Sequence, residues 1–344
     1  MPVKLEHSPP KRILIVRISA LGDIVFCTSL LEGLRRTYPT AHIAWLVEPN
    51  FGGILEGDPR INEIIRLPSG AMKSLSGLRA ARAMLRQEPK FDWVIDAQGL
   101  LKSRFLARCV KASRYFGFES KEPGAFLMNR LFAKGGDPAQ ISSEYRYLAA
   151  ELTGPDPGPP RLMPSRMSRE RAQKILENTS LDAGFIALCP FTTRPQKHWR
   201  EEHWGTLAHK LMDLGIGRCV LLGGPQDREA AKRIMAGMPR GSVDLVGATP
   251  LPDIAAVIDS ARLIIGVDTG LTHIGIAVRR PVIALFGSTR PYTEGADTAL
   301  RVVFHPLPCA PCKRNPTCGG TFACMRDLSP DLIAKVAGQF IGRA

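Results

Sequence analysis

Apolar runs of strand length alternate along the chain with helix-length stretches in which apolar residues recur every three or four positions. The runs that predict strands are 12–17, 42–47, 93–96, 185–189, 218–222, 263–267 and 282–286. Between them, the apolar positions within 24–34 and 204–214 have the spacing of helices with one buried face. Strands that alternate with helices in this way are typical of parallel sheets covered by helices, so the sequence predicts an α/β fold.

A segment rich in proline and glycine interrupts this alternation. Residues 153–164 read TGPDPGPPRLMP, and proline at this density continues neither a helix nor a central strand. Because 344 residues suffice for two domains, we interpret the segment as a linker between an N-terminal domain, 1–152, and a C-terminal domain, 165–325. A last helix, within 326–344, starts at Ser-Pro-Asp and has an apolar face that can pack on either domain, including back on the N-terminal one.

Composition excludes several classes of protein. Charged residues make up 23% and apolar residues 44% of the chain, as in ordinary globular domains and unlike disordered or collagen-like chains. No apolar run approaches the roughly 18 residues of a membrane-spanning helix, and residues 1–12 lack the apolar core of a signal peptide. We therefore expect a soluble, cytoplasmic protein.

The net charge of +14 predicts an anionic partner. Thirteen Lys or Arg and five Asp or Glu lie between Arg60 and Lys121, so we expect the anion to bind this stretch, although any one of these residues is more often simply solvated. Nucleic acid is disfavoured as the partner because the chain has no recognisable nucleic-acid-binding module and few aromatic residues among the basic ones. An anionic membrane surface or a phosphorylated substrate fits the charge better.

The junction after the first predicted strand carries a candidate carboxylate. It reads ISALGD, residues 18–23, with a single glycine rather than the Gly-x-Gly-x-x-Gly fingerprint of a dinucleotide-binding site, which counts against a nicotinamide-dependent oxidoreductase. Asp23 would more often be a helix N-cap than a reactive group if the loop stood alone.

Three further strand-to-helix junctions, all in the second half, have the residues of a phosphate site. Backbone N–H groups and the helix dipole favour anions at such junctions. The loop 192–199 offers two hydroxyls and two cations, including Lys197; the loop 223–227 ends in an acid; and the loop 268–273 combines an acid, a glycine, two hydroxyls and a histidine. The sequence therefore predicts that the C-terminal domain binds a nucleotide.

Four of the eight cysteines are clustered near the C-terminus. They follow the pattern Cys-x2-Cys-x5-Cys-x5-Cys, and these positions are Cys309, Cys312, Cys318 and Cys324. Four thiolates can hold a tetrahedral zinc ion, but the spacing is not a common zinc-ribbon pattern, so a structural zinc site and simple reduced thiols are equal alternatives. Disulfides rank behind both in a reducing cytoplasm. The other four lie in or beside apolar segments and are expected in the core.

Four motifs, RILIVRISALGDIVFCTSLL, IDAQGLLKS, TTRPQKHWREEHW and GVDTGLTH, occur in this order and together extend over most of the chain. In this combination the chain resembles the ADP-heptose:lipopolysaccharide heptosyltransferases of glycosyltransferase family 9, most closely the heptosyltransferase I type. The resemblance implies a GT-B fold, in which two Rossmann-like domains with parallel sheets face a cleft. It also implies an inverting enzyme that moves L-glycero-D-manno-heptose from ADP-heptose to the Kdo of the lipopolysaccharide inner core.

The resemblance assigns roles to residues at matching positions. It implies Asp23 as general base and Lys197 as the cation that stabilises the departing ADP. Donor-binding residues are implied at Thr192, Thr193, Lys197, Asp227, Asp268, Thr269, Gly270 and His273, where Asp227 replaces a glutamate of the family and is one methylene shorter. Acceptor-binding residues are implied at Ser19, Gly22, Lys102 and Lys121.

The resemblance also implies partners and a location. The acceptor is Kdo-lipid A, so the basic stretch, from Arg60 to Arg86 together with Lys102 and Lys121, is expected to face that phosphorylated lipid. The protein is then cytoplasmic and peripheral at the inner face of the inner membrane, with no nucleic-acid partner and no cofactor needed for catalysis. The alternatives are heptosyltransferase II, another family member with a different acceptor, and a non-catalytic nucleotide-sugar-binding protein.

Overall fold

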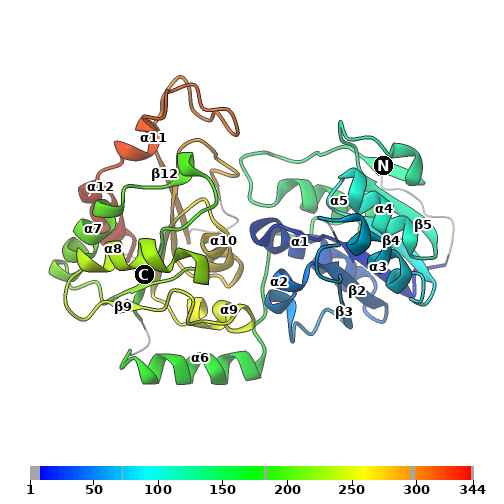
Figure 1. Cartoon of the computed structure of the whole chain (residues 1–344), viewed down its shortest axis with the longest axis horizontal. Coiled ribbons are helices and arrows are strands. Elements are labelled where there is room, and N and C mark those ends of the chain that lie inside the picture. Colours follow the sequence, from blue (N-terminus) through cyan, green and yellow to red (C-terminus); the bar gives the residue numbers. More distant parts are fainter. Residues whose placement is uncertain (1–7, 72, 182–183, 295–298, 342–344) are drawn as a thin grey trace. The chain divides into compact units, whose positions relative to one another are not determined.

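Each half of the chain forms its own parallel sheet. The structure, a computed structural model, describes residues 8–71, 73–181, 184–294 and 299–341. It divides into two units, Met1–Ser165 and Arg166–Ala344 (Figure 1). Both sheets have six strands, and the strand pairs within them are parallel, so the predicted α/β class is confirmed.

The sheet of the N-terminal unit has the strand order β3-β2-β1-β4-β5-β6. Its strands are β1 (Arg12–Val16), β2 (His42–Val47), β3 (Glu63–Arg66), β4 (Phe91–Asp96), β5 (Ala112–Phe118) and β6 (Arg130–Phe132). Its helices are α1 (Leu21–Thr37), α2 (Pro49–Gly52), α3 (Leu75–Leu85), α4 (Leu101–Cys109) and α5 (Ser143–Thr153), with 3₁₀ turns η1 (Gly53–Leu55) and η2 (Ala125–Leu127). The chain moves outward from β1 to β3 and then returns to β4, so right-handed crossovers place α1 on one face and α3 and α4 on the other.

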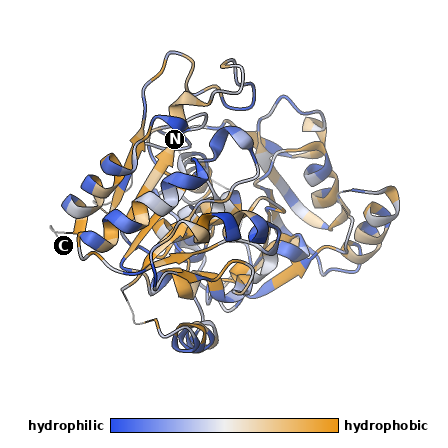
Figure 2. Cartoon of the chain, turned by 60° about the vertical axis from the view of Figure 1, so that its left-hand side comes forward, coloured by the Kyte–Doolittle hydropathy of each residue, from blue (hydrophilic) through white to orange (hydrophobic). Residues whose placement is uncertain are grey.

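Both faces of this sheet are buried. Ala81 and Leu85 of α3 and Leu106 of α4 pack on Leu14 and Val16 of β1. On the opposite face α1 packs against α5, where Ser142 Oγ donates to Ser29 Oγ at 3.0 Å. Figure 2 shows the result: the strands are largely apolar, whereas most helices have one polar and one apolar side.

The proline-rich segment predicted as a linker lies on the N-terminal unit. The backbone N–H of Arg161 donates to Thr28 Oγ1 at 3.0 Å, and the carbonyl of Arg161 accepts from Arg60 Nη2 at 2.6 Å. The division between the units therefore falls after Ser165, where α6 begins.

The sheet of the C-terminal unit has the strand order β12-β11-β10-β7-β8-β9. Its strands are β7 (Ile186–Cys189), β8 (Cys219–Leu221), β9 (Val243–Asp244), β10 (Leu263–Val267), β11 (Val282–Phe286) and β12 (Leu300–Phe304). Its helices are α6 (Arg166–Asn178), α7 (Glu201–Asp213), α8 (Arg228–Ala236), α9 (Leu251–Asp259), α10 (Gly270–Ala277), α11 (Ala323–Arg326) and α12 (Pro330–Ile341), with 3₁₀ turns η3 (Pro195–Lys197) and η4 (Pro225–Asp227).

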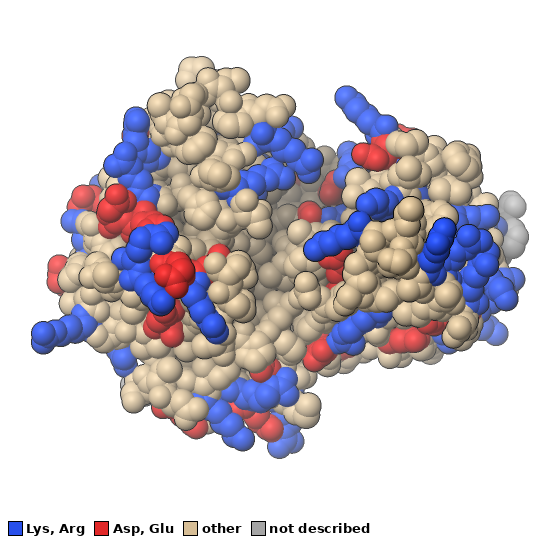
Figure 3. Space-filling view, in the orientation of Figure 1, with Lys and Arg blue, Asp and Glu red and all other residues tan. Residues whose placement is uncertain are grey.

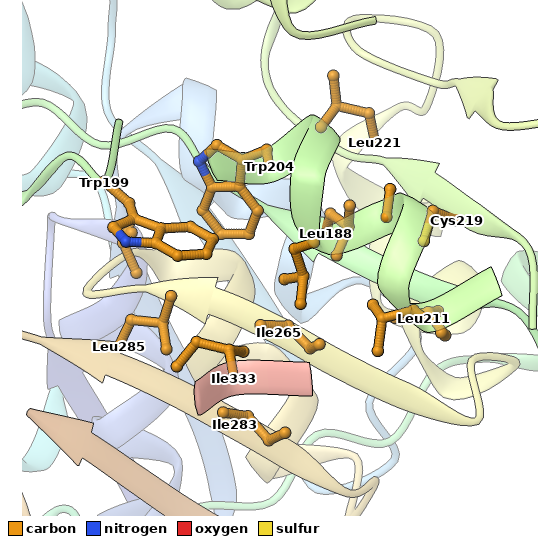
Figure 4. Close-up of a cluster of buried hydrophobic side chains, with 14 of the residues drawn as sticks. Leu188, Trp199, Trp204, Leu211, Cys219, Leu221, Ile265, Ile283, Leu285 and Ile333 are labelled. Atoms are coloured by element: carbon orange, nitrogen blue, oxygen red, sulfur yellow. The ribbon is translucent and has the colours of Figure 1, made fainter. Parts of the chain in front are cut away.

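The last helix completes the core of the C-terminal unit. Ile333 of α12 is fully buried beside Ile283 and Leu285 of β11, and α12 packs against α7 (Figure 4). In the same cluster the rings of Trp199 and Trp204 pack edge to face, with their centroids 4.9 Å apart. Trp199 Nε1 donates to the carbonyl of Leu328 at 2.8 Å. The helix predicted within 326–344 thus packs on the C-terminal unit; residues 342–344 lie outside the described part.

The strands that the sequence pattern missed are mostly those at sheet edges. The three runs 42–47, 263–267 and 282–286 coincide with β2, β10 and β11. By contrast β3, β6, β9 and β12 occupy the four edges, where one side of the strand is unpaired and polar residues are tolerated. An apolar run is therefore a good signal only for the central strands.

Candidate active site

Asp23 lies in the first turn of α1, directly after the strand-to-helix junction of β1. Its carboxylate Oδ2 is 2.5 Å from Arg17 Nη2, and its side chain is 44% exposed whereas that of Arg17 is 9% exposed. The helix N-cap is Ala20, so Asp23 is not the N-cap, and that alternative role is wrong. Asp23 is instead a half-exposed carboxylate with one oxygen paired to a buried guanidinium.

Arg17 is held by the neighbouring strand as well as by Asp23. Its Nη1 donates to the carbonyl of Ala97, just after β4, at 3.1 Å, and its Cζ lies 5.8 Å from the ring centre of Tyr145 on α5. These contacts fix the guanidinium at the carboxyl end of the sheet, and through it they fix the position of the Asp23 carboxylate.

The loop after β4 supports the loop that carries Asp23. Gln98 Oε1 accepts from the backbone N–H of Ile18 at 2.9 Å. Asp96 is fully buried and accepts from the N–H groups of Gln98 and Gly99 and from Ser103 Oγ at 3.1–3.2 Å. Burial raises the pKa of Asp96, although these hydrogen bonds oppose the change. The motif IDAQGLLKS is thus a scaffold at the carboxyl edge of the sheet.

The residues predicted to bind the acceptor lie at this same edge. Ser19 and Gly22 are partly exposed and share the loop of Asp23. Lys102 is the second residue of α4 and Lys121 follows β5; both side chains are exposed. Helices that follow parallel strands begin at the carboxyl ends of those strands, so the four positions lie along one edge, and acceptor contact remains a prediction for each.

Two arginines of the basic stretch are structural, which corrects the expectation that the whole stretch faces an anion. Arg60 is buried and pairs with Asp58 at 2.6 Å and Glu32 at 2.7 Å. Arg104 is fully buried and donates to the carbonyls of Phe118, Glu122 and Pro123 and to Ser120 Oγ at 2.8–3.0 Å. Burying either cation required these partners, so neither is available to a ligand.

The exposed cations of the stretch include several on α3 and α4. Lys and Arg side chains gather on the N-terminal unit, at the right of Figure 3. The exposed ones within the stretch are Lys73, Arg79, Arg82, Arg86, Lys90, Lys102, Arg108, Lys111 and Lys121. Arg66 is also exposed but pairs with Glu56 at 2.5 Å. The anion-binding surface predicted for this stretch is therefore limited to these exposed cations, of which Arg79, Arg82, Lys102 and Arg108 lie on α3 and α4.

Asp268, directly after β10, organises the corresponding edge of the C-terminal unit. Its Oδ2 lies 2.6 Å from Lys197 Nζ and accepts a hydrogen bond from Thr289 Oγ1, and its Oδ1 lies 3.2 Å from His273 Nε2. Burial alone would raise the pKa of Asp268, but the hydrogen bonds and charges of His273 and Lys197 outweigh it and hold the pKa well below its usual range. Asp268 is thus an ionised, buried anchor for Lys197.

His273 connects Asp268 to Tyr292. Its Nδ1 lies 2.8 Å from the Tyr292 hydroxyl, and its ring meets the Tyr292 ring edge to face. Tyr292 is fully buried, and burial raises the pKa of its hydroxyl well above the ordinary value. Both nitrogens of His273 are therefore engaged inside the protein, which makes this side chain a support for Asp268.

The loops at this edge approach one another closely. Thr192 Oγ1 donates to the carbonyl of Asp268 at 3.2 Å, so the loop that carries Lys197 is tied to the start of α10. Thr269 is the N-cap residue of α10 and has an extended backbone, but its side chain accepts no hydrogen bond from the first turn. The N–H groups of Gly270 and the next residues therefore have no capping side chain. Lys197 and these N–H groups together form a site suited to a diphosphate.

Asp227 is engaged within its own loop. Its Oδ2 accepts from the backbone N–H of Gly224 at 2.8 Å and from Gln226 Nε2 at 3.1 Å. Burial raises the pKa of Asp227, opposed by the Gly224 hydrogen bond and by His198. A ribose contact by this carboxylate remains a prediction, as does a donor contact by the exposed Thr193.

Two comparisons with known proteins identify the family of this chain. The family model for glycosyltransferase family 9 (heptosyltransferase) matches residues 78–321. Lipopolysaccharide heptosyltransferase 1 of Pseudomonas aeruginosa is 30% identical over 317 residues, which are 89% of this chain and 87% of that protein.

The chain belongs to glycosyltransferase family 9, the heptosyltransferases.

Solved structures extend the comparison to the fold of this heptosyltransferase. A family 9 glycosyltransferase from Veillonella parvula superposes with a TM-score of 0.84 at 24% identity and covers 97% of this chain and 98% of that one. E. coli heptosyltransferase WaaC with ADP-2-deoxy-2-fluoro heptose superposes with a TM-score of 0.71 at 27% identity. This match covers 95% of this chain and 99% of that one. The expected GT-B-like fold, glycosyltransferase class and heptosyltransferase I-like assignment are confirmed.

In this heptosyltransferase Cys309, Cys312 and Cys318 lie in a segment without regular structure between β12 and α11, whereas Cys324 is buried within α11. Cys309, Cys312, Cys318 and Cys324 form no disulfide. Across the described residues, no group of three or more His, Cys, Asp or Glu side chains is arranged to hold a metal ion. The segment is anchored by hydrogen bonds instead: Lys313 N donates to the carbonyl of Ser288 at 2.7 Å, and Gln196 Nε2 donates to the carbonyl of Lys313 at 3.2 Å.

Sequence reasoning missed three residues of the site: Arg17, Thr289 and Tyr292. Arg17 ends an apolar run and reads as a solvated residue, and Tyr292 and Thr289 follow β11 outside the quoted motifs. The available signal was their position, since each follows the carboxyl end of a central strand, where ligand sites of parallel sheets form.

No helix in the described part of the chain is long and apolar enough to cross a membrane.

Proposed function

We propose that this heptosyltransferase transfers L-glycero-D-manno-heptose from ADP-heptose to the Kdo of Kdo-lipid A, with inversion at the anomeric carbon. Family membership and 30% identity to a lipopolysaccharide heptosyltransferase 1 support this donor and acceptor. The observation that carries the proposal is Asp23: a half-exposed carboxylate at the carboxyl edge of its sheet, oriented by buried Arg17.

Asp23 acts as the general base. A sugar hydroxyl is a poor nucleophile until a carboxylate within hydrogen-bond reach accepts its proton as the new bond forms. Arg17 occupies Oδ2 of Asp23, which leaves Oδ1 as the oxygen that accepts the proton. As the hydroxyl oxygen attacks the anomeric carbon, the bond from that carbon to the ADP oxygen breaks, so direct displacement inverts the centre.

Lys197 and the first turn of α10 stabilise the leaving ADP. Negative charge grows on the departing diphosphate oxygen, and a cation already fixed in place stabilises that charge without reorganisation. Asp268 fixes Lys197 through their 2.6 Å contact, while His273 and Thr289 fix Asp268. This arrangement supports Thr192, Thr269 and Gly270 as neighbours of the diphosphate.

The acceptor is a lipid, so the proposal places the protein at the inner face of the inner membrane as a peripheral protein. Lys102 and Lys121, exposed at the edge that carries Asp23, would contact acidic groups of the acceptor. The contribution of these two lysines to acceptor binding should weaken as salt rises, because exposed charges are screened.

Catalysis by these residues requires no metal. Treatment with a chelator should leave turnover unchanged, and metal analysis of the purified protein would decide between a structural zinc at the four clustered cysteines and reduced thiols. Loss of turnover that returns only with added metal would contradict this part of the mechanism.

One experiment tests the function. The protein is incubated with ADP-heptose and either Kdo-lipid A or heptosyl-Kdo-lipid A, and the product is identified by mass. Heptose transfer to Kdo-lipid A is expected; transfer only to the second acceptor would assign heptosyltransferase II activity instead, and no transfer to either would favour a nucleotide-sugar-binding protein.

Asp23→Ala tests the mechanism in the same assay. We expect turnover to fall by about 100-fold or more, since general-base catalysis contributes about that factor, while the melting temperature changes little. Turnover close to wild type would show that Asp23 is not the base.

A further inference from the structure

Large apolar side chains are exposed at one edge of the N-terminal unit. Leu75 is 76% exposed, Phe126 is 86% exposed, and Leu100 and Leu101 are each 41% exposed. These four, which we call the apolar rim, are all the large apolar side chains exposed in the described part of this unit. Soluble proteins expose scattered apolar residues, but a group at one place marks an interaction surface.

The topology places the apolar rim at the edge that carries Asp23. Leu75 is the first residue of α3, Leu100 and Leu101 begin α4, and Phe126 lies in η2 after β5. Each therefore follows the carboxyl end of a parallel strand, as Asp23 follows β1. The rim and the proposed base belong to the same edge of the same sheet.

The rim belongs to one packed layer. Helices α3 and α4 are in contact, and α4 contacts η2. A Cβ atom built on Gly124 would lie 3.0 Å from Leu101 Cδ1, so the loop before Phe126 passes directly over the start of α4. Buried Arg104 binds the carbonyls of Phe118, Glu122 and Pro123 and thereby fixes that loop. Phe126 is thus presented outward by an ordered loop.

Exposed cations flank the residues of the apolar rim along the chain. Residues 67–87 contain no Asp or Glu, and Lys73, Arg79 and Arg82 are exposed on this stretch. Arg79 and Arg82 form no ion pair with a carboxylate of the described residues. Lys121 lies in the loop that leads to Phe126 and is exposed as well.

We propose that the apolar rim inserts into the headgroup region of an anionic lipid bilayer, with the surrounding cations on lipid phosphates. Apolar side chains bordered by Lys and Arg are the pattern of interfacial membrane binding, in which burial of apolar area and attraction to anionic lipid act together. The proposal deepens the proposed function, on which it rests: a bilayer at this edge brings the sugar of a membrane-embedded acceptor to Asp23.

Vesicle binding tests the surface separately from catalysis. The full chain is sedimented with vesicles of phosphatidylcholine alone and with added phosphatidylglycerol, at low and high salt. We expect binding to the anionic vesicles that weakens as salt rises. Phe126→Ser and Leu75→Ser should each lower the partition coefficient about tenfold, as expected for removing one inserted apolar side chain.

The matched control is Leu214→Ser, which removes a leucine that is 56% exposed in the C-terminal unit and should leave vesicle binding unchanged. Turnover with a Kdo acceptor that lacks acyl chains should equal wild type for Phe126→Ser and Leu75→Ser, which shows that these variants are folded.

Unchanged vesicle binding by Phe126→Ser and Leu75→Ser, or an equal loss in Leu214→Ser, would overturn the proposal. So would equal binding to neutral and anionic vesicles at all salt concentrations. If the rim variants lose vesicle binding but wild type transfers no heptose to Kdo-lipid A, the membrane surface stands and the proposed function fails.

Discussion

Substitution of Asp268 by Asn removes one charge from the centre of the donor-side network and keeps its shape. The carboxylate meets Lys197 Nζ at 2.6 Å, His273 Nε2 at 3.2 Å and the hydroxyl of Thr289, and its side chain is 10% exposed. Removing one partner of a buried ion pair costs about 3–5 kcal/mol. Lys197 retains some access to water, at 17% exposure, so we expect the lower end, about 3 kcal/mol.

Thermal unfolding measures this loss. At about 2–4 °C per kcal/mol, Asp268→Asn should lower the melting temperature of the C-terminal unit by about 6–12 °C. Thr289→Val is the matched control, because it removes one hydrogen bond to the same carboxylate and should cost only about 1 kcal/mol. Equal melting temperatures for Asp268→Asn and wild type would refute the reading of Asp268 as an ionised anchor.

The pH dependence of the difference in melting temperature between wild type and Asp268→Asn gives a second measurement. The pKa of Asp268 is lower in the folded state than its unfolded value of about 3.9, so the folded state binds fewer protons at this site. Its contribution to stability is therefore fully present above about pH 4 and is lost as pH falls toward the folded pKa. The gap in melting temperature between wild type and Asp268→Asn should narrow below about pH 4, and a gap that widens there would contradict the assignment.

Two further substitutions test the donor side. Lys197→Ala should lower kcat/KM for ADP-heptose by about 100-fold, because it removes the fixed cation beside the leaving group. Steady-state kinetics measures this loss, and circular dichroism should show that the fold is retained. An unfolded variant would indicate that Lys197 has a structural role instead. Gly266→Ala should lower the free energy of unfolding of the C-terminal unit by about 1–3 kcal/mol, measured by denaturant unfolding. The reason is that the new Cβ would lie 2.2 Å from Thr272 Oγ1 and 2.8 Å from Cys189 Cβ. A variant as stable as wild type would show that α10 can move away from β10.

All the central strands except β5 were predictable from sequence, because their burial leaves a simple signal. His42–Val47 and Leu263–Val267 lie between two other strands and under helices, so almost every position is apolar. Glu63–Arg66 and Leu300–Phe304 form sheet edges and carry charged residues, and no apolar run marks them. The short strand at Val243–Asp244 has only two residues, too few for any periodic pattern.

The basic stretch shows what a count of charges leaves out. Arg60 and Arg104 contribute to the excess between Arg60 and Lys121, yet both are buried and bonded to groups of the protein. Their partners are set by the tertiary fold: Arg104 lies on α4 and binds carbonyls after β5, up to 19 residues further along the chain. Only the fold separates these arginines from the exposed Arg79 and Arg82.

Both units contain the same kind of ion pair, but the member of the pair that is proposed to meet a substrate differs. In each, a carboxylate at the carboxyl edge of the sheet is paired with a largely buried cation: Asp23 with Arg17, and Asp268 with Lys197. The exposures run in opposite directions. Asp23 is 44% exposed and its cation 9%, whereas Asp268 is 10% exposed and its cation 17%. The group that meets a substrate must be the more accessible member of its pair, which favours the carboxylate as the reacting group in the N-terminal unit and the cation in the C-terminal one.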